Sequence, residues 1–219
     1  MNLKPFWHYA LALLALGAMG SVAAQTPSIT APVPPPDNAL AQRSVGDWLM
    51  RMHEASRKRA YTGTFVVSSS SGNLSSARIW HVCEGDQQME RVEALTGVPR
   101  STFRRNDQVV TFFPKAHIVK TERRESLGLF PNLLKSDDSS LDQFYSATPA
   151  GSGRVAGFDA SVVQLNPKDK LRFGYRIWSE KKSGLVVKLQ TLDTNGRVLE
   201  QSAFSDLQID APVKMSALA

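Results

Sequence analysis

The feature that most constrains this fold is a long succession of short β-type segments that begins at Tyr61. Turn residues such as Gly, Asn, Asp and Pro separate each segment from the next. The predicted strands are residues 61–69, 76–83, 89–95, 100–105, 108–113, 116–121, 153–157, 160–166, 171–179, 184–192 and 197–209. Parallel strands need long crossover connections, so segments this close together predict an antiparallel meander.

Two details refine this prediction. Asn195-Gly196 lies between the last two segments and is the strongest hairpin signal in the chain. In residues 171–178, apolar and polar positions alternate, which predicts a strand with one apolar face. That face would carry Leu171, Phe173, Tyr175 and Ile177.

A helix is predicted directly before the first strand. Its apolar residues follow the period of an α-helix: Val45, Trp48, Leu49, Met52 and Ala55. We expect this apolar face to pack on the sheet, and the basic residues 57–59 to end the helix. A second, short helix is predicted over residues 139–145, where Ser139 and Asp142 have the spacing of a capping box. The predicted fold class is therefore α+β, mostly β, built around a curved antiparallel sheet.

The N-terminus predicts export. Lys4, an apolar stretch from Tyr9 to about Met19 and the small residues that end at Ala24 are the three regions of a signal peptide. We expect cleavage after Ala24 and a periplasmic protein. A retained anchor is the alternative, but the apolar stretch is shorter than the about 20 residues that span a bilayer. We therefore do not expect an integral membrane protein.

Four regions follow along the chain. Residues 1–24 are the predicted signal peptide, and residues 25–43 are a flexible, Pro-rich segment with prolines at positions 27, 32, 34, 35 and 36. Residues 44–210 are the predicted β domain. Residues 211–219 contain a proline and are predicted to start a linker.

The formal net charge of +6 indicates which classes of partner the protein would attract. A basic surface attracts nucleic acid, anionic lipid or an acidic protein. Predicted export argues against nucleic acid. The phosphates of lipopolysaccharide or phospholipid, or an acidic protein segment, remain as counter-charges. The alternative is that the charge serves solubility alone.

Patterns of catalytic residues are missing from the sequence. It contains no G-x-S-x-G, no H-E-x-x-H, no phosphate-binding glycine loop and no C-x-x-C. His81 and Cys83 lie two apart on one predicted strand face, but two ligands do not make a metal site. Cys83 is the only cysteine, so it forms no intrachain disulfide. We expect a protein that is not an enzyme and needs no cofactor or metal.

The β pattern lapses between residues 123 and 147. Apolar residues surround Pro131 there: Leu127, Leu129, Phe130, Leu133 and Leu134. This segment either plugs one face of the sheet or forms a lid over a ligand pocket. Arg124 adds a cation beside it, a combination that suits an acyl chain with an anionic head group. We therefore predict a lipid-binding site formed by these five residues with Arg124 and Trp80.

Several short sequence motifs resemble those of a known protein family. They are residues 61–66 (YTGTFV), 76–81 (SARIWH), 97–100 (GVPR), 104–107 (RRND), 173–178 (FGYRIW), 183–188 (SGLVVK) and 196–201 (GRVLEQ). In their order and spacing, from about residue 45 to residue 209, they resemble the MucB/RseB family of periplasmic sigma-E regulators.

The resemblance implies a fold and a function. The fold would be an unclosed β-barrel like that of LolA and LolB, with helices in its concave face. The protein would bind the periplasmic domain of a membrane-bound anti-sigma factor, protect it from proteolysis, and sense lipopolysaccharide or mislocalised lipoprotein. A lipid or lipoprotein carrier on the same scaffold is the alternative. The family's second, smaller C-terminal β domain is not expected within these residues.

Overall fold

The computed structural model describes residues 45–124 and 141–218. The first part contains α2 (Val45–Lys58), β1 (Tyr61–Ser69), β2 (Leu74–Glu84), β3 (Gln87–Ala94), β4 (Ser101–Arg105), β5 (Gln108–Phe113), the 3-10 turn η1 (Pro114–Ala116) and β6 (Ile118–Arg123). The second part contains α3 (Leu141–Phe144), β7 (Tyr145–Val155), β8 (Phe158–Pro167), β9 (Gly174–Glu180), β10 (Val186–Leu192), β11 (Val198–Ile209) and the 3-10 turn η3 (Met215–Ala217).

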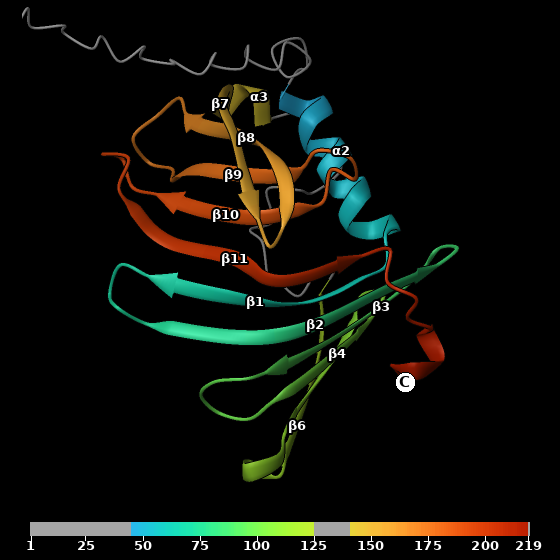
Figure 1. The fold of residues 1–219 in the computed structure, drawn as a ribbon. Helices are drawn as coiled ribbons and strands as arrows, with labels where there is room; N and C mark the ends of the chain where they lie inside the picture. Colours follow the sequence, from blue (N-terminus) through green and yellow to red (C-terminus); the bar gives the residue numbers. More distant parts are fainter. Residues whose placement is uncertain (1–44, 125–140, 219) are drawn as a thin grey trace, which may run out of the picture. The chain divides into compact units, whose positions relative to one another are not determined.

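All described strands belong to one antiparallel sheet made of two meanders (Figure 1). Strands β1 to β6 run outward from the centre to one edge, and strands β7 to β11 run from the other edge back to the centre. The two meanders meet where β1 pairs with β11. Within the described residues, the end strands β6 and β7 each have one neighbour, so the sheet is open. The predicted mostly β, unclosed antiparallel fold is confirmed.

Helix α2 packs on one face of the second meander, as its apolar spacing predicts. Trp48, Leu49 and Met52 are buried in a cluster with Leu165 and Ile177, which come from β8 and β9. Met50 lies on the other side of the helix and is exposed. The exposed position of Met50 shows that the helix has one buried face and one solvent face.

The junction of β1 and β11 is unusually close. Strand pairing runs from Tyr61 opposite Ile209 to Ser69 opposite Glu200, with a bulge between Thr64 and Phe65. At Gly63 the backbones approach so closely that an added Cβ would lie 2.4 Å from the carbonyl oxygen of Asp206. Only glycine fits at this point without moving a strand.

One strand prediction was wrong at its start. β9 begins at Gly174, whereas the alternating pattern predicted a strand from residue 171. Leu171 is 92% exposed and Phe173 is 52% exposed, so neither belongs to the predicted buried face. The Asp169 carboxylate accepts a hydrogen bond from the Leu171 backbone N–H at 2.9 Å, which closes a turn where the pattern indicated a strand.

Strand β7 is much longer than the predicted segment 153–157. The middle of β7 contains Pro149 and Gly151, residues that normally indicate a turn. β7 is an end strand of the described sheet, and its pairing with β8 is interrupted between Pro149 and Ser152. A proline is tolerated in such a position because no strand on that side needs its missing N–H.

The segment after β11 packs against the domain. Ala211 and Leu218 are buried, and the Met215 backbone N–H donates to a Glu84 carboxylate oxygen at 3.3 Å. These contacts lie within residues 211–218, the predicted beginning of a linker. The linker boundary itself stays a prediction.

We predict that Gly63→Ala destabilises the domain by about 1–3 kcal/mol or more, because the new methyl group must push β1 away from β11. Urea unfolding measures this loss. Gly174→Ala is the matched control, since the added Cβ there would meet its nearest neighbour, the Leu165 carbonyl oxygen, at an ordinary 3.4 Å. Equal destabilisation by the two variants would contradict the close approach at Gly63.

Candidate functional site

The first meander presents two faces of different chemistry. Residues opposite one another on neighbouring strands share a face. Trp80, Arg91, Phe103 and Val110 are successive partners across β2, β3, β4 and β5, so they form one row. Their neighbours in the chain form a second row on the opposite face: His81, Glu90, Arg104 and Val109.

The first face carries arginine and aromatic side chains in contact, which we call the arginine–aromatic ladder: Arg78, Trp80, Arg91, Phe103 and Phe112. The guanidinium of Arg78 lies 5.2 Å from the centre of the Trp80 ring. The guanidinium of Arg91 lies 5.5 Å from the Trp80 ring and 5.2 Å from the Phe103 ring. Phe103 meets Phe112 edge to face at 5.7 Å. A guanidinium stacked on a ring still has N–H groups that can bind a carboxylate or a phosphate.

The outer end of the ladder is exposed and apolar. Phe112 on β5 is 41% exposed, and its partner Val119 on β6 is 59% exposed. Arg91 forms an ion pair with Glu93, while its Nε is buried without a hydrogen-bond partner in the described part of the protein. The ladder therefore offers cationic and apolar groups side by side, which suits an anionic ligand or an acidic protein segment.

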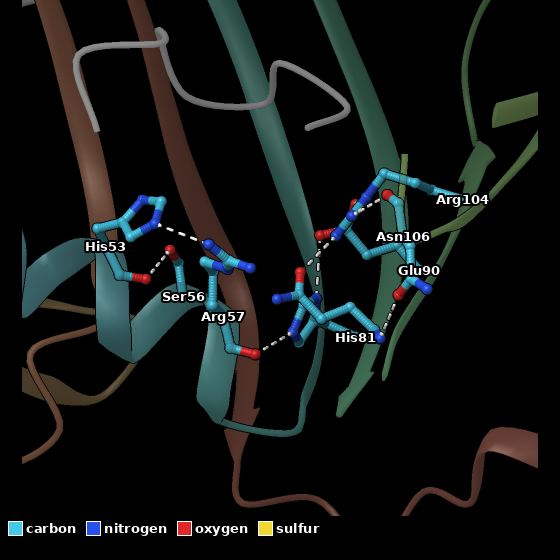
Figure 2. A network of polar contacts seen from close by, with 8 residues as sticks. His53, Ser56, Arg57, His81, Glu90, Arg104 and Asn106 are labelled. Carbon is cyan, nitrogen blue, oxygen red and sulfur yellow. Dashed lines mark hydrogen bonds and ion pairs between the residues drawn. The ribbon is translucent and has the colours of Figure 1, made fainter. Parts of the chain in front are cut away.

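The second face holds a buried polar network, drawn in Figure 2. The two oxygens of the Glu90 carboxylate contact His81 Nδ1 at 2.9 Å and Arg104 Nε at 2.8 Å. The other ring nitrogen of His81, Nε2, faces the carbonyl oxygen of Arg57 at the end of α2, at 3.4 Å. Arg104 also donates to the Asn106 carbonyl at 2.5 Å. The network thus connects α2 with three strands and the turn between β4 and β5.

Burial and the neighbouring charges have opposite effects on the pKa of Glu90. Burial alone would raise the pKa of Glu90, but the hydrogen bonds from His81 and Arg104 and their charges lower it to about 2. Tyr61 on β1 stacks on the His81 ring at 4.9 Å, and burial raises the pKa of its hydroxyl, as does the Glu90 carboxylate. The two ring nitrogens of His81 thus face two acceptors, the Glu90 carboxylate and the Arg57 carbonyl oxygen.

The network is structural in character. Its charged groups bind one another, since Glu90 contacts both His81 and Arg104. Over residues 45–124 and 141–218, no group of three side chains is arranged to hold a metal ion. His81, which with Cys83 formed the only candidate metal pair in the sequence, is a hydrogen-bonded core residue.

The structure describes two of the predicted ligand residues, Trp80 and Arg124, and places them apart. Trp80 lies in the ladder. Arg124 forms an ion pair with Glu122, which is the partner of Val109 and therefore lies on the face of the buried network. Trp80 and Arg124 thus lie on opposite faces of the sheet. The other predicted residues lie outside the described part: Leu127, Leu129, Phe130, Leu133 and Leu134.

Sequence reasoning missed the buried network, although a signal was present. Arg104 and Arg105 are adjacent on β4 and point to opposite faces, so Arg104 is buried while Arg105 is exposed. Once the hairpin between β2 and β3 turns at Gly85-Asp86, the register places His81 opposite Glu90. The next hairpin places Glu90 opposite Arg104. Hairpin registers, and not residue motifs, were the signal that could have found the network.

An open antiparallel sheet with one helix-covered face and one arginine–aromatic face is a scaffold for binding. The comparisons with known proteins identify its family. Residues 44–219 match the model of the MucB/RseB N-terminal domain, so this chain belongs to that family.

Characterised relatives agree with this assignment. The sigma factor AlgU regulatory protein MucB of Pseudomonas aeruginosa is 31% identical over 79% of this chain and 53% of its own length. The sigma-E factor regulatory protein RseB of Escherichia coli is 24% identical over 75% of this chain and 51% of its own length. The chain therefore spans about half the length of these curated relatives.

Solved structures agree as well. The MucA/MucB complex of Pseudomonas aeruginosa matches with a TM-score of 0.64 and 29% identity, over 80% of this chain and 60% of the solved chain. A crystal structure of MucB matches with a TM-score of 0.65 and 28% identity, over 79% and 61% of the two chains. Within the described residues, neither helix is long and apolar enough to cross a membrane.

We predict that Glu90→Gln lowers the free energy of unfolding by about 3–5 kcal/mol near neutral pH, because Arg104 stays buried without its counter-charge. The native pKa of Glu90 lies below the unfolded value of about 4.3. The stability that Glu90 contributes is therefore present above about pH 4.3 and lost as the pH falls toward about 2. Urea unfolding across this range should show a steeper acid loss for the wild type than for the variant.

The control for this prediction is Glu93→Gln on the same strand. Glu93 pairs with Arg91 on the ladder face and is partly exposed, so its loss should cost about 1 kcal/mol or less. Equal losses of unfolding free energy in the two variants would show that the buried network does not make Glu90 more important for stability than Glu93.

Proposed function

We propose that this protein is a periplasmic regulator of a sigma-E-type envelope-stress response. In this role it binds the periplasmic domain of a membrane-bound anti-sigma factor and protects it from proteolysis. The observation that carries the proposal is membership of the MucB/RseB family, together with the similarity to MucB in its complex with MucA. The predicted signal peptide, residues 1–24, supports the periplasmic location.

We assign the contact that this domain makes with the anti-sigma factor to the arginine–aromatic ladder. Arg78 and Arg91 supply cations for acidic residues, and Phe112 with Val119 supplies exposed apolar surface. Arginine and aromatic residues are enriched at the centres of protein interfaces. Strand β6, which contains Val119, is an end strand of the described sheet, and its outer edge suits a partner strand.

A lipid-type ligand is the second part of the proposal. We propose that lipopolysaccharide, or the acyl chain of a mislocalised lipoprotein, binds at Arg124 and the apolar residues Leu127, Leu129, Phe130, Leu133 and Leu134. Lys120 and Arg124 both contact the carboxylate of Glu122, at 3.0 and 3.2 Å. Two cations therefore share one acidic group, which leaves a positive surplus for an anionic head group. Trp80 lies on the other face and belongs to the ladder.

We predict that the exported protein retains the periplasmic domain of the host's anti-sigma factor in a pull-down, and that lipopolysaccharide competes with it. The double variant Arg78→Glu/Phe112→Asp should weaken retention at least about tenfold, because it removes one cation and one apolar contact of the ladder. Leu74→Asp is the control, since Leu74 is also an exposed apolar residue but lies outside the ladder.

Two results would contradict this assignment. Retention that is unchanged in the ladder variant would place the contact elsewhere on the domain. No retention of the wild type, with acyl lipid found in the purified protein by mass spectrometry, would favour a lipid or lipoprotein carrier on the same fold.

We predict that Leu129→Asp/Phe130→Asp weakens lipopolysaccharide binding at least about tenfold, because each charge would have to enter apolar surroundings. Calorimetric titration of the exported protein measures the affinity. Leu95→Asp is the control, an exposed apolar residue between β3 and β4. Unchanged affinity in the double variant would exclude this segment from the ligand site.

A further inference from the structure

The loop between β8 and β9, residues 168–173, presents apolar side chains to solvent. It is the orange connection at the left of Figure 1. Leu171 is 92% exposed, more than any other large apolar side chain in the described part, and Phe173 is 52% exposed. A single exposed apolar residue needs no explanation, but two of them within three residues of a short loop do.

The loop holds these side chains outward through specific contacts. The Lys168 backbone N–H donates to the Phe144 carbonyl at 2.8 Å, and the Tyr145 hydroxyl donates to the Phe173 carbonyl at 3.2 Å. The Arg172 guanidinium lies 4.0 Å from the centre of the Phe144 ring and forms an ion pair with Asp169. Because both ends of the loop are tied to α3 and β7, exposure of Leu171 is built into the fold.

Cations accompany the two apolar side chains. The loop reads Lys168, Asp169, Lys170, Leu171, Arg172 and Phe173, with three basic residues and one acidic residue. The one acidic residue, Asp169, is already paired with Arg172. Lys168 and Lys170 are both exposed. A net positive loop with protruding Leu and Phe is complementary to a surface that is anionic outside and apolar below.

We propose that the loop of residues 168–173 docks this domain on the surface of an anionic phospholipid bilayer. Leu171 and Phe173 enter the boundary between head groups and acyl chains, and Lys170 faces the lipid phosphates. A protein partner fits less well, because a stable interface buries about 800 Å² on each side, far more than a two-residue tip provides. A bilayer needs no complementary shape, so a small tip is sufficient.

This docking surface is distinct from the sites of the proposed function. The ladder lies on β2 to β5 and Arg124 follows β6, whereas the loop lies between β8 and β9 in the other meander. Bilayer docking also differs from binding one lipid molecule at a site, because it depends on the density of anionic lipid in a surface. Docking of the loop on a bilayer is therefore independent of anti-sigma factor binding, and the two can be tested separately.

The test is flotation of the exported, purified protein with lipid vesicles. We expect binding to vesicles of phosphatidylethanolamine and phosphatidylglycerol, and much weaker binding to vesicles of phosphatidylcholine alone. Leu171→Asp/Phe173→Asp should reduce binding to the anionic vesicles at least about tenfold, because two apolar groups no longer enter the bilayer. Lys170→Glu should reduce it several-fold through the lost attraction. The wild type and all variants have the same N-terminus, so vesicle binding by that end would not change the differences between them.

Leu74→Asp is the matched control. Leu74 is 69% exposed, and no charged residue lies within three positions of it in the chain, so this variant should bind vesicles like the wild type. Because Leu171 and Phe173 are exposed, the loop variants should unfold at the wild-type urea concentration and still retain the anti-sigma factor.

Three outcomes would overturn the proposal. The first is wild-type binding that does not distinguish phosphatidylglycerol from phosphatidylcholine vesicles. The second is unchanged vesicle binding in the double loop variant, or an equal loss in Leu74→Asp. The third is loss of anti-sigma factor binding in the loop variant with vesicle binding intact, which would assign the loop to a protein partner.

Discussion

The pairing of β1 with β11 is the interaction on which the rest of the structure depends. It joins residues about 140 positions apart and turns two meanders into one sheet. Phe65 of β1 and Phe204 and Leu207 of β11 enter the same buried cluster, so this part of the core forms only when the strands meet. The entropy lost in closing so long a segment must be offset by that burial. The close backbone approach at Gly63 shows how little space the junction leaves.

The buried polar network lies next to this junction. Tyr61 at the start of β1 stacks on His81 of β2, and His81 faces the last turn of α2. The helix, which packs on the second meander, is therefore also tied to the first through His81, which contacts Glu90. Alternation along the strands then separates two chemistries. Charges that stabilise the fold point to the helix side, and the arginine–aromatic ladder points away from it.

Much of the local structure could be predicted from the sequence, because strands, hairpins and amphipathic helices depend on neighbouring residues. The helix at 45–58, most strand positions and the hairpin at Asn195-Gly196 follow from such patterns. The failures arise from contacts and sheet positions that these patterns do not contain. Leu171 and Phe173 alternate like strand residues, but contacts of Asp169 and Arg172, including the one with Phe144, hold them in an exposed loop. Pro149 normally indicates a turn, yet it lies in β7, an end strand of the described sheet.

The mostly β class, the helix that packs on the sheet, the basic character and the family were all predictable without the fold. These follow from periodicity, composition and ordered strings, all of which are properties of the linear chain. Only the tertiary structure decided which residues share a face. It placed Trp80 and Arg124 on opposite sides and brought His81, Glu90 and Arg104 together, since one residue of shift in strand register exchanges the faces. The register within each hairpin depends on the exact position of its turn, which composition and periodicity do not fix to the residue.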